Sequence, residues 1–444
     1  MCGIFGAFEA GGLHLSDAVL NDMAKSILHR GPDHIGLFRE GACALGNCRL
    51  SIIDLTAAAN QPQFSDDGQI VVVQNGEIYN YLELRDELIA AGYQFATTGD
   101  TEVLLRAFEA WGPRFVERLN GMFAIAIYDR SSDILYLFRD RLGVKPLYLY
   151  QDGDGRLLFA SEIKALLSAG IQPVPDMGAI AQYLALNYIP QPKTVLAGVS
   201  HLPPGHMATI DVHSGLKVER YWDLAAVQSN AEMTEAEAKS GLLTLLDDAT
   251  RIRMRSDAEY GAFLSGGLDS TSVVGFMSLY RPEGLRSFSI GFDDPRFDEF
   301  SFAHLAAERF GTIYQTQIMP METTNRWARF IWHCDQPHGD VSFIPMDQVS
   351  ALAARDVRMV LTGDGGDELF AGYEKYLSIF PEGRTDHLVE GWEDEFVNPP
   401  VFCSAISLIR CWSARCATHF SIRTLMRHCL MKFGGVTTKT RSTR

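Results

Sequence analysis

The first half of the chain alternates short apolar runs with turn-forming residues, a pattern that favours strands joined by hairpins. Residues 70–74 form an apolar run that predicts a strand, and Asn75-Gly76 after it is a turn signal. Residues 122–128 and 134–138 predict two further strands, with the polar stretch 129–131 as the hairpin between them.

Two helical stretches lie among these strands. Residues 81–91 predict a helix that Gly92 ends, because glycine readily adopts the left-handed conformation found just after helices. A second helix is predicted after Ser161, a residue type that caps helices, and it ends at Gly170. Many strands with hairpin connections and a few helices predict a layered α+β domain.

In the second half of the chain, apolar strands alternate with helices instead of being joined by hairpins. A polar linker at 223–232 precedes a long helical stretch that contains four leucines between 242 and 246. Beyond it, apolar strands alternate with helices: the strands are predicted at 260–264, 287–292 and 358–361, and the helices at 271–280 and 300–310. This alternation predicts a parallel sheet with crossover helices, which is an α/β domain.

Composition limits the classes of function. A chain of 444 residues predicts two or three domains, since one domain takes ~100–200 residues. The net charge of −16 argues against binding to nucleic acid or to anionic membranes. No apolar run reaches the ~18–20 residues of a membrane span, and no basic stretch followed by an apolar one indicates a signal peptide. We therefore expect a cytoplasmic protein.

The end of the chain differs in charge from the rest. Residues 396–444 hold eight Lys and Arg and no Asp or Glu, whereas the first 395 residues hold 31 basic and all 55 acidic residues. Four of the eight cysteines also lie there: Cys403, Cys411, Cys416 and Cys429. This abrupt change indicates a segment of different origin or environment. It is either a basic binding tail or, as we favour, a shifted reading frame or artificial terminus.

Cys2 is a candidate nucleophile in the run Met1-Cys2-Gly3-Ile4-Phe5-Gly6. Because Met1 is followed by a small side chain, we expect removal of the initiator methionine, which leaves Cys2 with a free α-amine. One residue then carries both a thiol and a base able to take its proton, an established way to activate a nucleophile. A lone cysteine at this place is more often an ordinary residue, so the hypothesis depends on the rest of the chain.

A glycine-rich loop, Ser265-Gly266-Gly267-Leu268-Asp269-Ser270, lies between an apolar strand and a helix. Such a loop presents backbone N–H groups and the positive end of a helix dipole to an anion, and glycines let the backbone approach a phosphate closely. Asp269 is a candidate Mg²⁺ ligand, since Mg²⁺ usually bridges a protein carboxylate and a substrate phosphate. A plain turn is the alternative, and the strand–loop–helix context makes a nucleotide loop the favoured interpretation.

A second glycine-rich loop, residues 362–368, follows another apolar strand and reads Thr-Gly-Asp-Gly-Gly-Asp-Glu. Parallel strands place such loops together at the carboxyl edge of the sheet, where ligands bind in open α/β folds. Asp269 and Asp367 are therefore expected to face one cation from two loops. A solvated charged turn is the alternative, and the paired loops make it the weaker one.

Together these features resemble the glutamine-hydrolysing asparagine synthetases, a class of amidotransferases, over about residues 1–380. Singly the motifs are weak, but in this order and spacing they are very specific. They are Met1-Cys2-Gly3-Ile4, His29-Arg30-Gly31-Pro32-Asp33, residues 49–54, Asn75-Gly76-Glu77-Ile78-Tyr79-Asn80, residues 99–102, 139–148 and 159–162, the two glycine loops, and Phe288-Ser289-Ile290-Gly291-Phe292.

The resemblance implies two domains. The first, at 2–218, would be an N-terminal-nucleophile glutaminase, an αββα sandwich of the type 2 glutamine amidotransferases. The second, at 235–391, would be an α/β parallel-sheet ATP-pyrophosphatase domain like the adenine nucleotide α-hydrolases, incomplete at its end. The basic, cysteine-containing tail at 392–444 follows. A homodimer, common in the family, is the oligomer that the resemblance suggests.

For the first domain, the resemblance implies that Cys2 attacks the glutamine carboxamide and releases ammonia. Asn75 and the Gly76 N–H would bind the oxyanion, which needs fixed donors. Arg49 offers a bidentate fork for the α-carboxylate of glutamine, Asp100 and the nearby backbone suit its α-ammonium, and Glu77 is also expected to bind glutamine. Without the family, an ordinary surface ion pair would be preferred for Arg49 and Asp100. His29 and Arg30 are expected to brace the loop near Cys2.

For the second domain, the resemblance implies a site for ATP and Mg²⁺ that activates aspartate as an acyl-adenylate. ATP would be bound by Leu264, Ser265, Gly266, Gly267, Asp269, Ser270, Ile290, Thr362 and Gly363. Asp269 and Asp367 would hold Mg²⁺. Asp364 matches a catalytic position that carries glutamate in close relatives. Ammonia would then displace AMP and give asparagine.

Two departures keep alternatives open. Family members run well past 444 residues, and from about 391 onward the chain does not align securely, so it is expected to be truncated at its C-terminus. Gln336 replaces a common glutamate, although Asp335 is kept. The alternatives are a chain with glutaminase activity only, an amidotransferase acting on another carboxylate in surface-glycan biosynthesis, or a non-catalytic binding homologue. The intact set of Cys2, Arg49, Asn75 and Asp100 argues against the last.

Overall fold

The computed structural model of the chain describes residues 2–373, except for 229, 231, 294–299 and 320–325. Apart from 184–186, the described residues belong to one compact unit. The tail expected at 392–444 and the end of the domain expected at 235–391 lie outside the described residues.

The first of two antiparallel six-stranded sheets holds the start of the chain near its centre. Its order is β10-β8-β9-β1-β3-β2. The strands are β1 (Gly3–Phe8), β2 (His34–Glu40), β3 (Cys43–Arg49), β8 (Tyr148–Gln151), β9 (Leu157–Ala160) and β10 (Val199–His201). β1 pairs on one side with β3, Gly3 lying opposite Cys48, and on the other with β9, Phe5 lying opposite Ala160. All six residues of β1 are buried, so the backbone that follows Cys2 is fixed in the sheet.

The second sheet has the order β12-β11-β7-β6-β5-β4. Its strands are β4 (Gln63–Phe64), β5 (Ile70–Ile78), β6 (Gly121–Asp129), β7 (Ile134–Arg139), β11 (His206–Asp211) and β12 (Gly215–Arg220). The turn expected at Asn75-Gly76 is wrong, because β5 runs through both residues and pairs them with Ala124 and Phe123 of β6. A Cβ on Gly76 would lie 1.9 Å from the carbonyl oxygen of Met122, so close approach to β6 is what requires glycine here.

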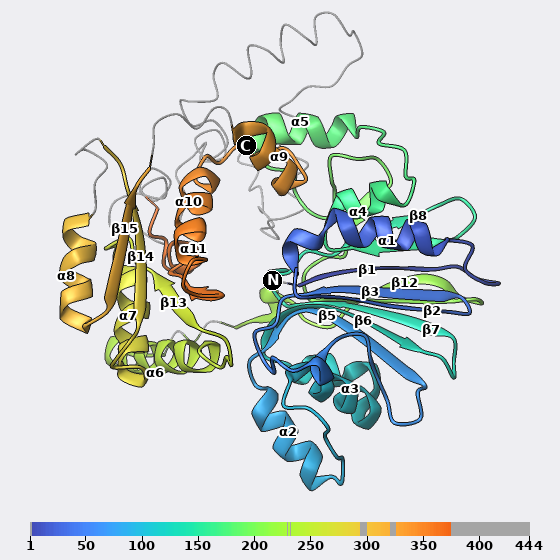
Figure 1. Ribbon diagram of the computed structural model, residues 1–444, viewed down its shortest axis with the longest axis horizontal. Coiled ribbons are helices and arrows are strands. Elements are labelled where there is room, and N and C mark those ends of the chain that lie inside the picture. The colour runs from blue at the N-terminus through green and yellow to red at the C-terminus, as the bar shows by residue number, and fades with distance from the viewer. Residues whose placement is uncertain (1, 229, 231, 294–299, 320–325, 374–444) are drawn as a thin grey trace, which may run out of the picture. The chain divides into compact units, whose positions relative to one another are not determined.

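Helices cover the outer faces of the two sheets. α1 (Asp17–Ser26) and α4 (Ile163–Ser168) pack on the first sheet, and α2 (Tyr81–Ala90) and α3 (Asp100–Trp111) lie on the side of the second. Figure 1 shows the resulting order of helix, sheet, sheet and helix. The αββα sandwich expected for the first domain is therefore confirmed.

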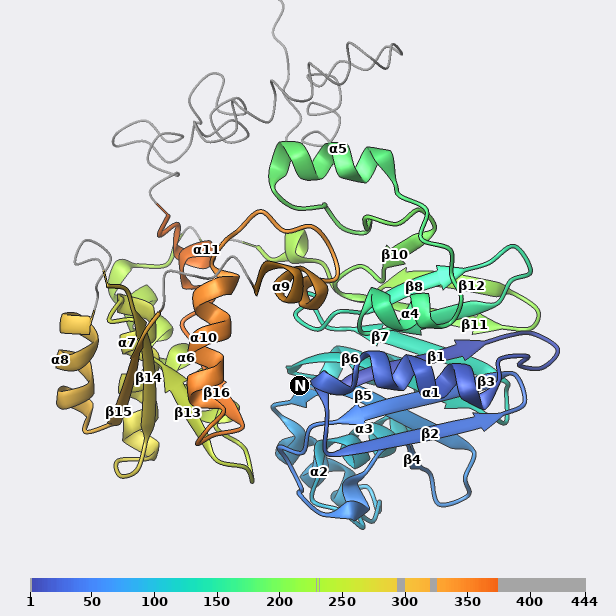
Figure 2. The same cartoon turned by 45° about the horizontal axis from the view of Figure 1, so that its top comes forward.

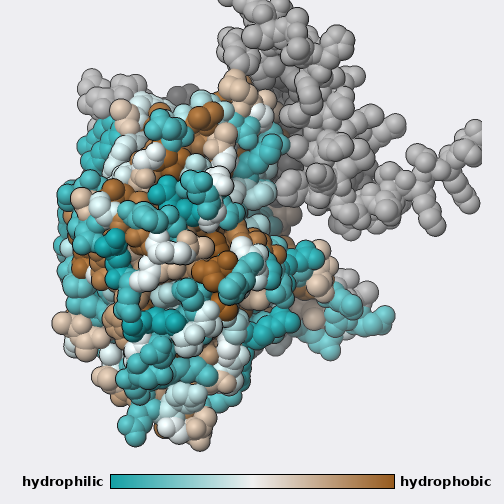
Figure 3. All heavy atoms as spheres, turned by 90° about the vertical axis from the view of Figure 1, so that its right-hand side faces the viewer, coloured by the Kyte–Doolittle hydropathy of each residue, from teal (hydrophilic) through white to brown (hydrophobic). Residues whose placement is uncertain are grey.

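Alternating side chains along each strand fill separate apolar layers. Ile4 of β1 meets Val71 and Val73 of β5 between the sheets, whereas Phe5 faces Leu20 and Met23 of α1. A third layer lies between β5 and α3, where Val72 packs near Val103. On the face drawn in Figure 3, hydrophobic side chains form small patches among hydrophilic ones, as expected when the large apolar side chains lie inside.

Further short helices lie within the sandwich region, and one short and one long helix lie between the sandwich and the parallel sheet. α5 (Met177–Leu186) precedes β10, and short 3-10 helices lie at Leu28–Arg30, Ala57–Ala59, Gly112–Arg118 and Leu224–Ala226. The predicted long helix is α6 (Glu235–Arg253). It begins with a capping box in which Thr234 and Glu237 exchange hydrogen bonds, so the polar linker ends at a well-defined helix start.

The four strands of the last sheet are all parallel, in the order β15-β14-β13-β16. The strands are β13 (Tyr260–Phe263), β14 (Arg286–Gly291), β15 (Ile313–Ile318) and β16 (Met359–Leu361). The helices between and after them are α7 (Leu268–Tyr280), α8 (Phe300–Phe310), α9 (Trp327–Cys334), α10 (Phe343–Ala353) and α11 (Gly366–Phe370). The predicted α/β domain is confirmed; β15, α9 and α10 were not predicted.

Helices lie on both faces of this sheet. Ala262 and Leu264 pack with residues of α7 and α8 such as Val274, while Phe288 packs against Val349 of α10. Figure 2 shows α8 and α10 on opposite sides of the sheet. The described helices include none long and apolar enough to cross a membrane.

Candidate functional site

Cys2 is held by contacts on its sulfur and on its main chain. The backbone N–H of Leu50 donates to the sulfur at 3.4 Å, and the thiol lies 3.6 Å from the carbonyl oxygen of the same residue. The carbonyl oxygen of Cys2 accepts a hydrogen bond from Arg30 Nε at 3.0 Å. Arg30 therefore supports the backbone at Cys2, as the sequence analysis predicts.

The environment of the thiol disfavours its ionised form. Burial raises the pKa of the Cys2 thiol, and the N–H of Leu50 and the charge of Arg49 offset this only in part. Because the thiolate is the attacking form, nucleophilic chemistry at neutral pH needs a base beside the sulfur.

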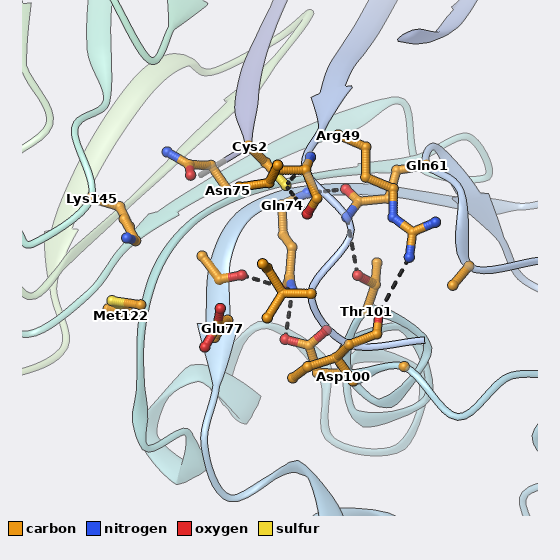
Figure 4. A pocket seen from close by; sticks show the side chains of 16 residues that line it. Cys2, Arg49, Gln61, Gln74, Asn75, Glu77, Asp100, Thr101, Met122 and Lys145 are labelled. Carbon is orange, nitrogen blue, oxygen red and sulfur yellow. Dashed lines mark hydrogen bonds between the residues drawn. The ribbon is translucent and has the colours of Figure 1, made fainter. Parts of the chain in front are cut away.

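A pocket opens onto Cys2, with walls from both sheets of the sandwich and from the start of α3. Its lining residues are Cys2, Arg49, Leu50, Ile52, Ile53, Ala59, Gln61, Gln74, Asn75, Gly76, Glu77, Gly99, Asp100, Thr101, Met122 and Lys145. Figure 4 shows Arg49 and Asp100 at different sides of the space near Cys2. All six residues expected to form a glutamine site therefore line one pocket.

Arg49 ends β3 and its guanidinium is fixed by neutral acceptors. Nη1 donates to the carbonyl of Thr56 at 3.0 Å and to the side chain of Asn60 at 2.7 Å. Nη2 donates to the carbonyls of Ile53, at 3.2 Å, and Asp54. These four acceptors carry no charge, so they orient the buried guanidinium without neutralising it. Such a group attracts an anionic ligand.

Asp100 is the first residue of α3 and its carboxylate is buried. It accepts hydrogen bonds from Gln74 Nε2 at 2.8 Å and from the backbone N–H of Ile78 at 3.0 Å. Burial raises the pKa of the Asp100 carboxyl, and these two donors oppose that rise. Gln61 holds Gln74 in turn, because its side-chain oxygen accepts the N–H of Gln74 at 2.6 Å. The sequence patterns identified Asp100 but neither glutamine.

Asn75 lies deep between the two sheets, beside the start of β1. Its Nδ2 is 3.4 Å from the hydroxyl of Ser161, and that hydroxyl accepts the N–H of Ile4 at 2.9 Å. The expected capping role of Ser161 is therefore wrong: α4 has Glu162 as its N-cap, and Ser161 instead joins β1 to β5. The amide of Asn75 is a donor that lines the same pocket as Cys2, and an oxyanion site requires a fixed donor of this kind.

Glu77, which is partly exposed, and the buried Lys145 add two ionisable groups to the pocket. Burial, and then the charge of Asp100, raise the pKa of Glu77, while Lys145 opposes the rise. Burial lowers the pKa of Lys145, and Glu77 opposes that fall. The sequence motifs predict that Glu77 binds glutamine, and they include Lys145 without indicating a role for it.

The two glycine loops lie together at the carboxyl edge of the parallel sheet. β13 pairs directly with β16, so the loops that follow these strands are neighbours. A Cβ on Gly363 would lie 2.7 Å from the backbone nitrogen of Ser270, and one on Gly366 would lie 2.3 Å from a carboxylate oxygen of Asp269. The backbone contact requires glycine at Gly363, whereas a side chain at Gly366 would have to displace the carboxylate of Asp269. The expected meeting of the two loops is confirmed.

Hydroxyl groups fix the first loop just before α7. Ser265 and Ser270 lie 3.0 Å apart through their hydroxyl oxygens, and the N–H of Gly267 donates to Ser265 at 3.2 Å. Gly266 has φ +88°, a left-handed conformation that suits glycine. The residues expected to bind ATP, Leu264 to Ser270 with Ile290, Thr362 and Gly363, thus gather where the parallel strands end.

Carboxylates at this edge suit a hard cation. Asp364 accepts a hydrogen bond from the Thr362 hydroxyl at 2.9 Å. Asp269 lies against Gly366 of the second loop, and Asp367 against Gly372. In the described part of the chain, no three His, Cys, Asp or Glu residues are grouped to hold a metal. Carboxylates from two adjoining loops still fit Mg²⁺, which takes one or two of them together with substrate phosphates.

Comparison with protein families gives two matches. Residues 1–222 match the model described as glutamine amidotransferase domain, and residues 241–426 match the model described as asparagine synthase. The boundary between the matches falls between the sandwich and the parallel sheet.

Three curated relatives show the range of similar proteins. The chain is 36% identical to glutamine-hydrolyzing asparagine synthetase 1 of Bacillus subtilis, over 86% of this chain and 61% of that protein. It is 35% identical to a putative asparagine synthetase of the same kind from Methanocaldococcus jannaschii, over 85% and 76% of the two chains. It is also 32% identical to amidase chyE of Penicillium rubens, over 78% and 54%.

Proposed function

The chain belongs to the family of glutamine-hydrolysing asparagine synthetases, and we propose on this basis that it releases ammonia from glutamine and transfers it to ATP-activated aspartate. The observation that carries the proposal is the pocket in which Cys2 lies with Arg49, Asn75 and Asp100. The chain spans 61% of the length of the Bacillus relative, so its activity, substrates and partners are all part of the proposal.

Glutamine binding would use the two buried charges at different sides of the pocket. The guanidinium of Arg49, which its neutral acceptors leave with a full charge, would pair with the α-carboxylate. Asp100 and Glu77 would receive the α-ammonium, and its positive charge would lower the raised pKa of both carboxyls. The side-chain amide of glutamine would then extend toward Cys2.

Amide cleavage would begin with the thiol of Cys2. After removal of Met1, the α-amine of Cys2 would take the thiol proton, which supplies the base that the raised pKa of the thiol requires. Sulfur would then bond to the amide carbon, and the oxygen would become an oxyanion bound by Asn75 and the N–H of Gly76. The α-amine would return the proton to the leaving nitrogen, ammonia would depart as the C–N bond breaks, and the remaining thioester would be hydrolysed by water to glutamate.

The carboxyl edge of the parallel sheet would activate the acceptor. Leu264, Ile290, Thr362 and Gly363 would contact ATP, and the loop from Ser265 to Ser270, including Gly266, Gly267 and Asp269, would bind its phosphates. Asp269 and Asp367 would hold Mg²⁺, which when bound would neutralise charge on the phosphates. Asp364 would assist formation of the acyl-adenylate. The β-carboxylate of aspartate would bond to the α-phosphorus as pyrophosphate leaves, and ammonia would then displace AMP.

Two assays on the full chain test the proposal. Glutamate release from glutamine should be abolished in Cys2→Ala and kept in Cys43→Ala, whose cysteine lies buried in β3 away from the pocket. Activity that survives Cys2→Ala would sink the assignment. Aspartate-dependent exchange of pyrophosphate into ATP then tests the second site.

A different carboxylate acceptor is the second candidate. It is favoured by one observation: a relative that matches 78% of this chain is named an amidase rather than an asparagine synthetase. Running the exchange assay with a panel of carboxylic acids separates the two, because only the true acceptor supports exchange. A cytoplasmic location and a homodimer remain predictions from the sequence.

A further inference from the structure

Four charged side chains form a continuous line that ends at the main chain of Cys2. Asp335 lies 2.9 Å from Lys164 Nζ, and Lys164 Nζ contacts Glu162. Glu162 accepts from Arg30 Nη1 at 2.8 Å, and Arg30 Nε donates to the carbonyl of Cys2 at 3.0 Å. We call Asp335, Lys164, Glu162 and Arg30 the Cys2 charge network.

The members of the network fix one another because they are buried. Their side chains are between 7% and 12% exposed, and their charges alternate in sign along the line. Buried charges are tolerated only when they are paired and hydrogen-bonded, so each member restricts the orientation of the next. Glu162 also contacts His29 Nε2 at 3.1 Å, and the Lys164 ammonium lies 4.6 Å from the centre of the Trp332 ring.

Asp335 joins this network from a distant part of the chain. It follows α9 with φ +64°, and its carboxylate accepts the N–H of Ile163 and, at 3.4 Å, that of Lys164. Its neighbour Gln336 accepts the N–H of Val195 at 3.0 Å. Asp335 lies in the region that matches asparagine synthase, whereas the other three members lie in the amidotransferase match.

We propose that Asp335, Lys164 and Glu162 are positioning residues for glutamine hydrolysis, which act by orienting Arg30 and, through it, the backbone of Cys2. The inference rests on the proposed function and extends it: the thiol is set in place partly by a residue of the synthase-matched region. Arg49 and Asp100 are outside the network, so weakening it should lower kcat for glutamine and leave KM nearly unchanged.

The test uses Asp335→Asn and Lys164→Met in the full chain. Asparagine keeps the shape and an acceptor oxygen, and methionine keeps the hydrocarbon stem against Trp332, so each removes mainly a charge. We expect kcat for glutamate release to fall at least tenfold while KM stays within twofold. The control is Asp356→Asn, which removes a 3.4 Å ion pair with Arg286 outside the network and should change neither constant by more than twofold.

A second readout separates this inference from the proposed function. The rate at which iodoacetamide alkylates Cys2, followed by mass spectrometry of the N-terminal peptide, reports the environment of the thiol without any glutamine. We expect that rate to change at least threefold in both variants and not in the control. If the unaltered protein releases no glutamate, the proposed function fails and alkylation alone judges the network.

Three results would overturn the inference. The first is a folded variant with kcat and alkylation rate within twofold of the parent. The second is a loss of activity that appears wholly in KM. The third is failure of both variants to fold, judged by circular dichroism, while the control folds, because the network would then serve the fold and not the thiol.

Discussion

The carboxylate of Asp257 accepts a hydrogen bond from the backbone N–H of Asp54 at 2.7 Å, across 203 positions of the sequence. The carbonyl of Asp54 in turn accepts from Arg49 Nη2. The carbonyl of Ile52 also accepts the N–H groups of Asp257, at 2.9 Å, and Ala258. The segment that leads into β13 therefore holds the loop that follows Arg49 and lines the pocket.

This relationship predicts that Asp257→Ala weakens glutamine binding. Loss of one partly buried hydrogen bond of this kind costs about 1 kcal/mol, and we expect the KM for glutamine to rise by up to about fivefold, with kcat within twofold. Steady-state kinetics of glutamate release measure both constants. Asp248→Ala, which removes an exposed pair with Arg251, is the control and should leave KM unchanged. An unchanged KM in Asp257→Ala would show that the loop keeps Arg49 in place unaided.

Gln74→Met should make glutamine binding depend on pH. The carboxyl of Asp100 has a pKa raised by burial and opposed by the Gln74 donor, so removal of that donor raises the pKa further. A carboxyl with a higher pKa is protonated first as the pH falls, and it then loses its attraction for the α-ammonium. The ratio of KM between variant and parent should therefore grow from pH 8 to pH 6. A ratio that is flat over this range would contradict the proposed role of Asp100.

Gly363→Ala should impair the nucleotide site and spare the thiol site. The added Cβ would lie 2.7 Å from the backbone nitrogen of Ser270 and 2.9 Å from Cβ of Asp269, so the two loops have to separate. We expect nucleotide binding, followed with a fluorescent ATP analogue, to weaken at least tenfold while glutamate release is unchanged.

The matched control is Gly241→Ala, within α6, where a Cβ meets nothing within 4 Å. Alanine is favoured over glycine in a helix by up to ~1 kcal/mol, so this variant should bind nucleotide normally and unfold at an equal or higher temperature. Equal nucleotide binding by both variants would mean that the loops adapt to the extra methyl group.

His201 should make the protein less stable in mild acid. Burial, with the nearby charge of Arg139, lowers the pKa of His201 from about 6.5 to about 3. The folded state then keeps the ring neutral while the unfolded chain takes up a proton below pH 6.5, so stability falls as pH falls. Between pH 6.5 and pH 5 this amounts to at most ~2 kcal/mol.

Removal of that titration should flatten the pH dependence. In His201→Gln the midpoint of thermal unfolding should decline less between pH 7 and pH 5 than in the parent, measured by circular dichroism at matched salt. Parallel curves for the two proteins would assign the acid sensitivity to other groups.

Local patterns were enough to predict β5, β6 and β7, three strands of the parallel sheet and both glycine loops, together with the helices α2, α4, α6, α7 and α8. β13, β14, β16 and the helices α7 and α8 are marked by apolar runs and by glycine, and these signals act over a few residues. The turn predicted at Asn75-Gly76 was wrong because the same dipeptide can form a turn or allow a close contact between strands. Only the position of Met122 on β6 distinguishes the two cases. The helix cap predicted at Ser161 was wrong for a similar reason. The hydroxyl of Ser161 bonds to Ile4, which is 157 residues away, and no local pattern reveals that partner.

The parts of the site that the sequence did not predict are those built by long-range contacts. Gln61 and Gln74 carry no motif of their own, and their roles appear only when Asp100 is brought beside β5. Asp335 was noted only as a retained family residue, because nothing in its own segment reveals Lys164 as its partner. The sequence motifs identified the residues whose side chains have a recognisable chemical role. The residues that orient them could be identified only from the three-dimensional structure.

The place of β1 between β3 and β9 also governs when the protein can assemble. Its two neighbours in the sheet end at residues 49 and 160, so a chain emerging from the ribosome offers the first partner early and the second much later. Synthesis adds about 5–20 residues each second, so several seconds separate the synthesis of β3 from that of β9, the second strand that pairs with β1. Pairing over such sequence separations is slow in its own right. The first few residues to be made thus gain their second neighbour in the sheet only after residue 160 has been made.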